Sequence, residues 1–182
     1  FTSPHLIKIN ERFRINFKEC SDEELINAWC SVKDYMVKGK EKGLQSLTFF
    51  EILFFMGMLI FSQKAVDYCI LETGLGGRLD ATVLSNPVLS VITSISYDHT
   101  EILGDTIEQI AAEKAGIIKE GIPVVAIDEE NGAFSVIERT AKEKNAPVYG
   151  LKSQELTILK KCENTIDFSI NSRYYKISNL KV

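Results

Sequence analysis

The stretch that decides the fold covers residues 66–95 and reads VDYCILETGLGGRLDATVLSNPVLSVITSI. It contains an apolar segment at 66–72, a glycine-rich loop at 74–80 and a second apolar segment at 87–95. Short apolar runs bounded by Gly and Pro are typical of strands, and a nearly continuous run is typical of a strand covered on both faces of a sheet. The stretch therefore predicts two strands connected through the loop.

Strand and helix patterns alternate toward the C-terminus. We expect a helix capped by Asp105 or Thr106, a strand at 122–127, a helix at 132–144 and a short strand at 147–149. Strand, helix and strand at this spacing imply parallel βαβ units. The predicted fold class is α/β, with an open, mostly parallel sheet flanked by helices.

The pattern changes after Lys152, where ELTILKK, TIDFSI and RYYKIS alternate between apolar and polar residues. Period-two alternation in short segments predicts an antiparallel meander, which we place at the edge of the domain. The chain of 182 residues suits one domain with a sizeable core. We expect residues 1–182 to form a single partial domain.

Two helices are expected before the deciding stretch. Ser21 with Glu24, and Thr48 with Glu51, have the spacing of capping boxes. The second box opens the run FFEILFFMGMLIF at 49–61, which is apolar all round and should be buried on most sides. A bilayer span needs about 20 apolar residues, so this run predicts a buried helix rather than a membrane span.

Composition excludes several classes of protein. Hydrophobic residues make up 45% and charged residues 25%, and the net charge is -4, so bulk electrostatics point to neither a nucleic-acid nor a membrane partner. The four cysteines show no C-x-x-C pair, which favours a reducing, cytoplasmic setting over disulfides or zinc. The start of the chain has neither a signal-peptide pattern nor an initiator Met, so we expect it to begin inside a larger reading frame.

Polar residues follow both strands of the deciding stretch. Ligands of open α/β sheets bind beyond the carboxyl ends of the strands, so we expect these residues to meet on one rim. They are Glu72 with the loop TGLGGRLDAT, and Ser94, Ser96, Asp98, His99 and Thr100.

The pattern alone leaves the roles of these residues open. The loop fits neither G-x-G-x-x-G nor G-x-x-x-x-G-K-[ST], so it could be only a tight turn. Glu72 could ligate Mg²⁺ or serve as a cap or ion-pair partner. His99 could be a metal ligand, a general base or a structural residue. Lys114 could be a solvated lysine near a helix C-terminus.

Three segments together resemble the folylpolyglutamate synthase/dihydrofolate synthase family, a branch of the Mur-ligase superfamily. They are FTSPHL with INER at 1–12, ETGLGGRLDAT at 72–82, and ITSISYDHTEILGDTIEQIAAEKAGIIK at 92–119. The resemblance implies the P-loop-type central domain of an ATP- and Mg²⁺-dependent ligase. Such a ligase joins L-glutamate to folate, to dihydropteroate or to both, through an acyl phosphate.

The resemblance also implies residue roles. Ser3, Glu72 and His99 match magnesium ligands, and Lys114 matches a lysine that is carbamylated in the superfamily. We take Lys114 and His99 as the candidate catalytic residues. The candidate substrate-binding residues are Pro4, His5, Arg78 and Asp80.

The sequence departs from the family in three respects. The Gly-Lys-Ser phosphate loop and the second α/β domain are not within the chain, and Val83 stands where the family usually has Asn. We therefore expect the chain alone to lack ligase turnover, and by analogy we expect a monomer. The alternatives are another Mur-like amino-acid ligase and a noncatalytic binding remnant.

Overall fold

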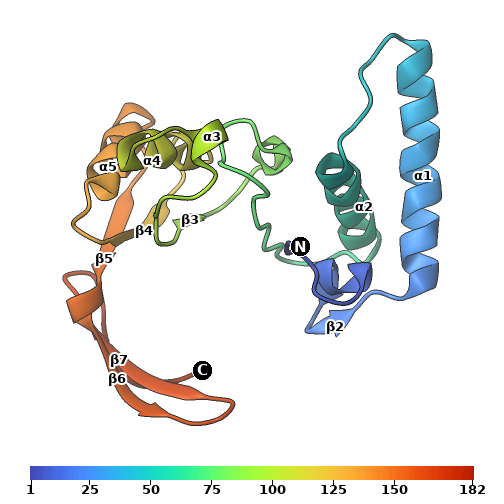
Figure 1. The fold of residues 1–182 in the computed structure, drawn as a ribbon. Coiled ribbons are helices and arrows are strands. Elements are labelled where there is room, and N and C mark those ends of the chain that lie inside the picture. Colours follow the sequence, from blue (N-terminus) through green and yellow to red (C-terminus); the bar gives the residue numbers. More distant parts are fainter. The chain divides into compact units, whose positions relative to one another are not determined.

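The computed structural model describes residues 1–182 and divides them into two compact units. Unit 1 comprises Phe1–Leu75 and Leu79–Leu84, and unit 2 comprises Gly76–Arg78 and Ser85–Val182. Each unit has its own hydrophobic core and is described by itself (Figure 1). Whether the two units make one domain stays a prediction.

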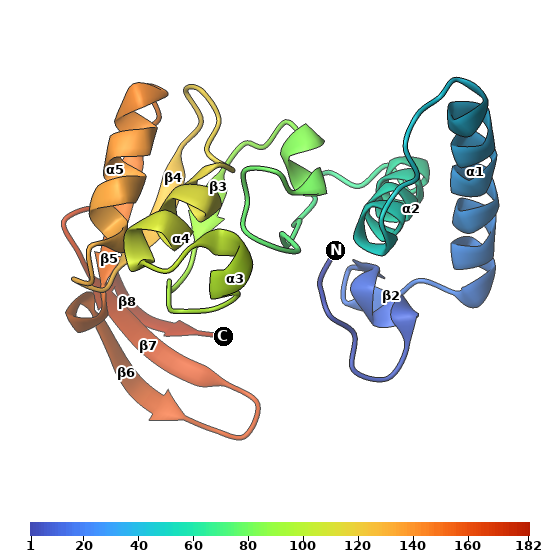
Figure 2. The same cartoon turned by 45° about the horizontal axis from the view of Figure 1, so that its top comes forward.

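Unit 1 is built on two packed helices. Helix α1 spans Asp22–Glu41 and helix α2 spans Phe49–Gln63, and both begin with the predicted capping boxes at Ser21 and Thr48. They lie side by side in both ribbon views (Figures 1 and 2). The expected burial of α2 is partly met, because Leu53 and Ile60 are buried while Phe49 is 61% exposed.

The start of the chain closes the core of unit 1. The 3-10 helix η1 (Ile9–Arg12) leads into a small antiparallel pair, β1 (Arg14–Ile15) and β2 (Lys18–Glu19). The Phe1 ring lies 5.6 Å from the ring centroids of both Phe13 and Phe50. These contacts fasten the N-terminal segment to α2.

The strand predicted at 66–72 is not formed, and this prediction was wrong. The segment has no regular secondary structure. It makes two strand-like backbone hydrogen bonds with Phe1: Phe1 N donates to Ile70 O at 2.8 Å, and Glu72 N donates to Phe1 O at 3.0 Å. Tyr68 and Ile70 are 81% and 86% exposed. A strand inside a parallel sheet needs neighbours on both sides and covered faces. This segment has only Phe1 beside it, and only Val66 and Leu71 pack against the core.

Unit 2 contains the parallel sheet. Strands β3 (Ser90–Ile92), β4 (Val124–Asp128) and β5 (Val148–Lys152) lie in the order β3-β4-β5, and both pairings are parallel. The predicted α/β class and parallel pairing are therefore confirmed. Strand β3 is shorter than the expected 87–95, because it pairs only with β4 and its residue Val91 is 54% exposed.

Three helices accompany the sheet of unit 2: α3 (Thr100–Leu103), α4 (Ile107–Ala115) and α5 (Ala133–Glu143). Thr106 caps α4, as the sequence predicts, and its hydroxyl accepts from the backbone N–H of Gln109 at 3.2 Å. Helices α4 and α5 pack together and close the core over β4 (Figure 2). Fully buried members of this core are Ile110, Ala111, Ala115, Ile118, Val124 and Ala141.

The predicted antiparallel meander is confirmed at the C-terminal end. The short 3-10 helix η3 (Ser153–Glu155) precedes β6 (Leu156–Lys161), β7 (Ile166–Asn171) and β8 (Lys176–Lys181), which pair in that order. The register aligns Ile158, Phe168 and Leu180 in one row across the strands. The adjacent row of Lys160, Asp167 and Lys181 faces the other way, so the sheet has an apolar and a polar face.

The remaining short element is the 3-10 helix η2 (Ala81–Leu84) in unit 1. None of the helices combines the length and the apolar character that crossing a membrane requires. All four cysteines are free, and Cys20 alone is buried.

Candidate functional site

Two predicted metal ligands meet in unit 1. The backbone N–H of Ser3 donates to Oε2 of Glu72 at 2.8 Å, and Glu72 is held in turn by its own N–H on Phe1 O at 3.0 Å. Ser3 is half-buried and Glu72 is exposed. Ser3 carries a hydroxyl and Glu72 a carboxylate, and both groups are hard oxygen donors of the kind that Mg²⁺ prefers. The pair therefore fits the expected ion by its chemistry.

The loop after Ser3 is held by a carboxylate that the pattern analysis did not single out. Glu11 accepts hydrogen bonds from the backbone N–H groups of Leu6, Ile7 and Lys8, each at 2.8 Å. Bonds from Leu6, Lys8 and Ile7, in that order of weight, lower the pKa of Glu11 from 4.5 to about 2. The available sequence signal for this role was a Glu a few residues after a loop whose backbone N–H groups lack partners of their own. The segment INER at 9–12 contains that Glu.

The candidate substrate residue His5 is also oriented within the chain. Its Nδ1 accepts a hydrogen bond from Nε of Arg12 at 2.9 Å. Arg12 is buried at 8% exposure, and its guanidinium lies 5.9 Å from the centroid of the Phe49 ring. Beyond them Leu6 and Ile7 are each 90% exposed, so the loop presents an apolar tip next to a fixed imidazole.

Asp80 organises the glycine loop. Its Oδ2 accepts from the backbone N–H groups of Gly74 at 2.8 Å and Leu75 at 3.3 Å. Its Oδ1 accepts from the backbone N–H of Thr82 at 2.9 Å and from the Thr82 hydroxyl at 2.6 Å. A buried carboxylate with this set of donors fixes a tight turn, which was one of the readings left open for the loop.

Arg78 pairs inside unit 2. Its side chain donates two hydrogen bonds to Oε1 of Glu113, on helix α4. The structure thus gives both Arg78 and Asp80 partners within the chain, and substrate contact by either stays a prediction.

His99 lies in the loop after β3, as the sequence predicts. It has a left-handed backbone (φ 49°) at the N-terminus of α3, and its Nε2 lies 3.7 Å from Oδ1 of Asp98. Two residues of the loop after β4 hold the start of this segment. Glu129 accepts from the Ile95 N–H at 3.2 Å, and the Asn131 amide donates to Ile95 O at 3.1 Å. Sequence reasoning missed both residues.

Lys114 lies in the last turn of α4 and is half-buried. Its side chain forms neither a hydrogen bond nor an ion pair in the structure, unlike that of Lys144, which reaches Ile118 O at 2.6 Å. No three side chains of His, Cys, Asp and Glu lie close enough together to hold a metal ion. The shared rim expected for Glu72 and His99 is not formed within one sheet, because 66–72 is not a strand.

The comparisons with known proteins address the family. The description "Mur ligase middle domain" matches residues 23–180, which is most of the chain. The chain belongs to the Mur ligase middle-domain family. The resemblance read from the three sequence segments is thereby confirmed.

Curated relatives show which branch of the family the chain is most similar to in sequence. The chain is 45% identical over 152 residues to the dihydrofolate synthase/folylpolyglutamate synthase of Bacillus subtilis, covering 83% of this chain and 35% of that protein. It is 40% identical over 144 residues to a folylpolyglutamate synthase of Arabidopsis thaliana, covering 79% of this chain and 25% of that protein. The chain therefore spans roughly a quarter to a third of the length of these relatives.

Solved structures of family members share the fold. The folylpolyglutamate synthase of Thermotoga maritima has a TM-score of 0.85 at 31% identity, over 99% of this chain and 41% of that one. E. coli FolC in complex with DHPP and ADP has a TM-score of 0.81 at 32% identity, over 100% of this chain and 41% of that one. An FPGS-AMPPCP-folate complex has a TM-score of 0.85 at 31% identity, over 100% of this chain and 45% of that one.

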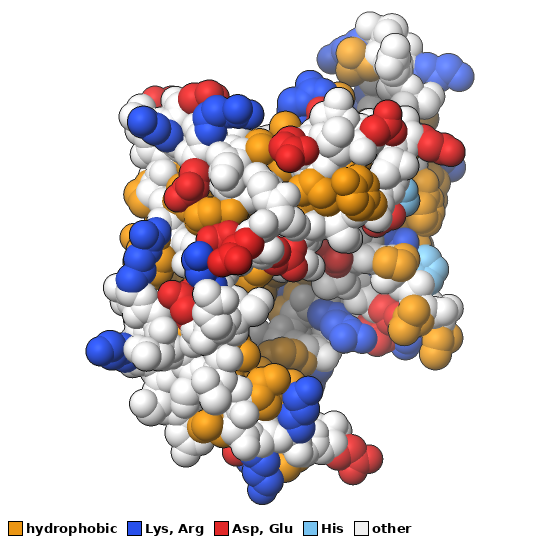
Figure 3. All heavy atoms as spheres, turned by 60° about the vertical axis from the view of Figure 1, so that its left-hand side comes forward, with side chains coloured by type: hydrophobic (Ala, Val, Ile, Leu, Met, Phe, Trp, Pro, Cys, Tyr) orange, Lys and Arg blue, Asp and Glu red, His pale blue; other side chains and the backbone are white.

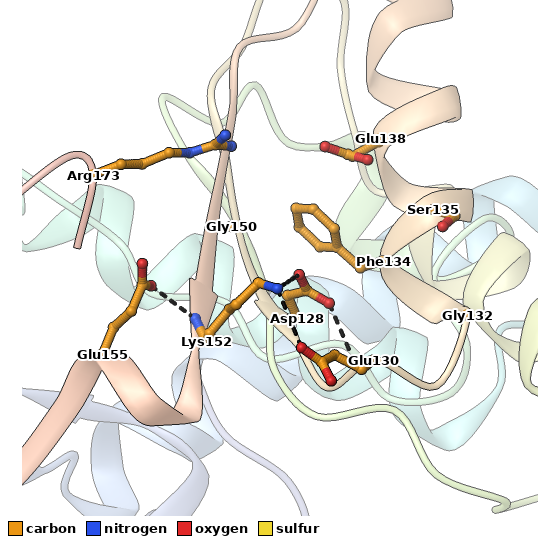
Figure 4. A pocket seen from close by; sticks show the side chains of 10 residues that line it. All are labelled: Asp128, Glu130, Gly132, Phe134, Ser135, Glu138, Gly150, Lys152, Glu155 and Arg173. Carbon is orange, nitrogen blue, oxygen red and sulfur yellow. Dashed lines mark hydrogen bonds and ion pairs between the residues drawn. The ribbon is translucent and has the colours of Figure 1, made fainter.

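A cavity of about 530 Å³ lies in unit 2 of this family member, and none of the site residues predicted from the sequence lines it. Its walls come from the ends of β4 and β5, the start of α5 and the turn between β7 and β8 (Figure 4). Lys152 bridges Asp128 at 3.6 Å and Glu130 at 3.2 Å, and hydrogen bonding to Glu130 is the main cause that raises the Lys152 pKa.

The charge of this cavity argues against a polyanion. Four carboxylates and two cations line it, and one cation, Lys152, is already paired. Figure 4 shows Arg173 and Glu138 reaching toward the space above the Phe134 ring from different sides. The surface in view in Figure 3 likewise mixes both signs of charge, without a broad basic field that would attract nucleic acid.

Proposed function

We propose that the chain is the central section of an ATP-dependent ligase that joins L-glutamate to folate, to dihydropteroate or to both. The observation that carries the proposal is the 45% identity to the B. subtilis dihydrofolate synthase/folylpolyglutamate synthase across 83% of this chain. The bond from the Ser3 backbone N–H to the Glu72 carboxylate also supports it, because it brings together two residues whose side chains carry oxygen donors.

The chemistry we assign to the intact enzyme has two steps. A carboxylate oxygen of the acceptor attacks the γ-phosphorus of ATP, so that an acyl phosphate forms and ADP leaves. The amine of L-glutamate then attacks the acyl carbon, phosphate departs with the bonding electron pair, and the amine loses a proton. No protein nucleophile is needed, which agrees with the lack of a Ser-His-Asp or Cys-His signature in the sequence.

Ser3 and Glu72 in unit 1, and His99 in unit 2, would each serve as ligands of magnesium ions. When bound, Mg²⁺ supplies charge neutralisation at phosphate oxygens. The protein contributes the fixing of its donors: Ser3 N–H holds the Glu72 carboxylate, and the loop after β4 holds the segment that leads to His99. The Glu11 clamp and the Arg12 bond hold the loop with Pro4 and His5, which would face the folate-type acceptor.

Lys114 would act as a carbamate. Its neutral Nζ attacks the carbon of CO₂, a C–O π bond becomes a carboxylate, and Nζ releases a proton to water. The product is an anionic oxygen donor in place of an ammonium group that would repel a metal ion. Carbamylation uses the neutral amine of the lysine, because only the neutral nitrogen has a lone pair for the attack on CO₂.

The proposal extends to the setting. We place the protein in the cytoplasm, in line with its free cysteines, and by analogy with related enzymes we propose that it is a monomer. We further propose that residues 1–182 alone do not turn over, because the chain spans 35% of the B. subtilis relative and carries no Gly-Lys-Ser phosphate loop. Glutamate-dependent ADP formation by these residues alone would contradict that.

The deciding experiment uses a chain extended at both ends to the length of its relatives. ADP release is measured with Mg-ATP and L-glutamate, with dihydropteroate and tetrahydrofolate offered separately. Release that requires glutamate and one acceptor supports the ligase and identifies its branch. If the folded protein releases no acceptor-dependent ADP, the proposal fails, and another Mur-like ligase or a binding module takes its place.

A further inference from the structure

The glycine loop docks on the last turn of helix α4, one residue before Lys114. The backbone N–H of Arg78 donates to Glu113 O at 2.9 Å. The Arg78 side chain adds two bonds to Oε1 of Glu113, from Nε at 3.0 Å and from Nη2 at 2.9 Å. Main chain and side chain of Arg78 are therefore both fixed to the same residue of the helix, and the side-chain bonds are charge-assisted.

Two glycines make this contact a close approach of one backbone to another. A Cβ at Gly77 would lie 2.8 Å from the carbonyl oxygens of both Glu113 and Lys114. A Cβ at Gly116 would lie 2.3 Å from Cα of Arg78. Real Cβ atoms essentially never come within 3.0 Å of such neighbours, so neither position can carry a side chain while the contact persists.

This contact sets the orientation of Lys114. Successive residues of an α-helix are about 100° apart around its axis, so holding Glu113 holds the rotation of the turn and the direction in which Lys114 leaves it. The turn's own bonds are longer than the one to Arg78: Gly116 N donates to Glu113 O at 3.2 Å and Ile117 N to Lys114 O at 3.3 Å. The Lys114 side chain is half-buried and forms neither a hydrogen bond nor an ion pair, so the turn that carries it sets the direction in which it leaves the helix.

We propose that Arg78 and Glu113 are positioning residues that hold the last turn of α4 so that Lys114 is presented for carbamylation. The inference rests on the carbamylation assigned to Lys114 above. In this proposal Arg78 acts through its bonds to Glu113 and does not contact a substrate.

The test compares four forms of the 182-residue chain with the wild type. Arg78→Ala and Glu113→Ala remove the side-chain pair, and the double exchange Arg78→Glu with Glu113→Arg restores attraction with the charges reversed. The control is Arg14→Ala, which breaks a comparably exposed pair with Glu19 in unit 1. The first readout is the ¹³C NMR carbamate signal as ¹³C-bicarbonate is added, and the second is amide hydrogen exchange at Gly116 and Ile117.

Both single variants are expected to need roughly tenfold more bicarbonate for the same carbamate signal, which is the lower end of the loss seen when the partner that orients a metal-ligating side chain is removed. Their Gly116 and Ile117 amides should exchange faster. The double exchange should recover part of both effects, and Arg14→Ala should match the wild type. A wild-type bicarbonate requirement in Arg78→Ala, with unchanged amide exchange, overturns the proposal.

The design separates this inference from the function on which it rests. If the wild type itself gives no carbamate signal, the carbamylation of Lys114 is rejected. The hydrogen exchange of the Gly116 and Ile117 amides then tests whether Arg78 and Glu113 hold the helix. Faster exchange in Arg78→Ala that the double exchange reverses then supports the positioning of α4. Exchange that is equal in all forms rejects it.

Discussion

Single carboxylates hold together the loops that carry the candidate chemistry. Glu11 bridges three backbone amides, Asp80 bridges both ends of the glycine loop, and Glu72 accepts from Ser3. Each carboxylate accepts hydrogen bonds from backbone N–H groups that lie outside helices and sheets. Irregular segments avoid the free-energy cost of unpaired backbone polar groups in this way. These residues therefore decide the shape of the site before any ligand arrives.

The Glu11 clamp yields a prediction about pH. Its pKa falls from 4.5 to about 2 on folding, so the folded state binds the proton less tightly than the unfolded chain. The stabilisation is thus fully present above pH 4.5 and is lost as the pH falls toward about 2. Amide exchange at Leu6, Ile7 and Lys8 should stay slow down to that range.

Glu11→Gln provides the comparison. An amide offers one acceptor oxygen and cannot take bonds from three amides equally, so exchange at the same positions should be fast at every pH. The Glu24→Gln variant is a matched control, because it alters a capping box on α1 and leaves the loop alone. Exchange at Leu6 to Lys8 that does not respond to Glu11→Gln would contradict the clamp.

Among the helices and strands, features that depend on nearby residues could be predicted from the sequence, whereas pairing with a distant strand could not. The capping boxes at Ser21 and Thr48, and a cap at Asp105 or Thr106, could be predicted because a cap is satisfied within four residues. The structure forms both boxes and places the third cap at Thr106. The meander was readable because strands close in sequence pair with one another. The strand at 66–72 was not formed, because apolar character predicts burial but does not supply the neighbour that burial requires.

The same difference applies to the residues of the candidate site. Ser3, Glu72, His99 and Lys114 came from motif resemblance, while the residues that hold them came only from the structure. Glu129 and Asn131 act through bonds between distant loops, and nothing in local spacing marks such partners. Glu11 acts locally, on residues three to five positions before it. Arg78 was found as a motif residue, yet its bond to Glu113, 35 positions away, could not be read from the sequence.

The contact between α5 and β5 gives a second prediction. A Cβ at Gly150 would lie 2.3 Å from Cζ of Phe134, so Gly150→Ala must displace a ring that packs on the core. Such overpacking costs about 1–3 kcal/mol of unfolding free energy. Gly39→Ala is the matched control: its nearest neighbour would be 3.6 Å away and it lies within α1, where Ala gains up to about 1 kcal/mol over Gly.

Urea unfolding followed by far-UV circular dichroism measures both variants. The midpoint should fall for Gly150→Ala and should rise slightly for Gly39→Ala. Equal midpoints for Gly150→Ala and wild type would show that Phe134 does not pack on the strand as the structure has it.

On the scale of the whole molecule, the chain has two cores and not one. One core gathers around Phe13, Leu53 and Ile60, and the other around Ile110, Val124 and Ile137. They share no buried residue. A single cooperative transition is expected only where one core spans the chain, so this protein should depart from it.

Trp29, the single tryptophan, lies in unit 1 and reports on that unit alone. We therefore expect denaturation monitored by Trp29 fluorescence to have a different midpoint from denaturation monitored by NMR amide signals of β4. Coincident midpoints would mean that the two units unfold together. Repeating the experiment with Gly150→Ala sharpens it, because that change should move the β4 transition and leave the fluorescence transition in place.

The two-faced meander has a consequence for how the protein behaves in concentrated solution. Its outer strands β6 and β8 leave backbone groups open, and Leu156, Ile158 and Leu180 on the apolar face are 45%, 47% and 41% exposed. Each outer strand also carries two lysines: Lys160 and Lys161 on β6, and Lys176 and Lys181 on β8. Lysines on open edges oppose the stacking of one molecule's strand on another's, so these four act as gatekeepers against fibre growth.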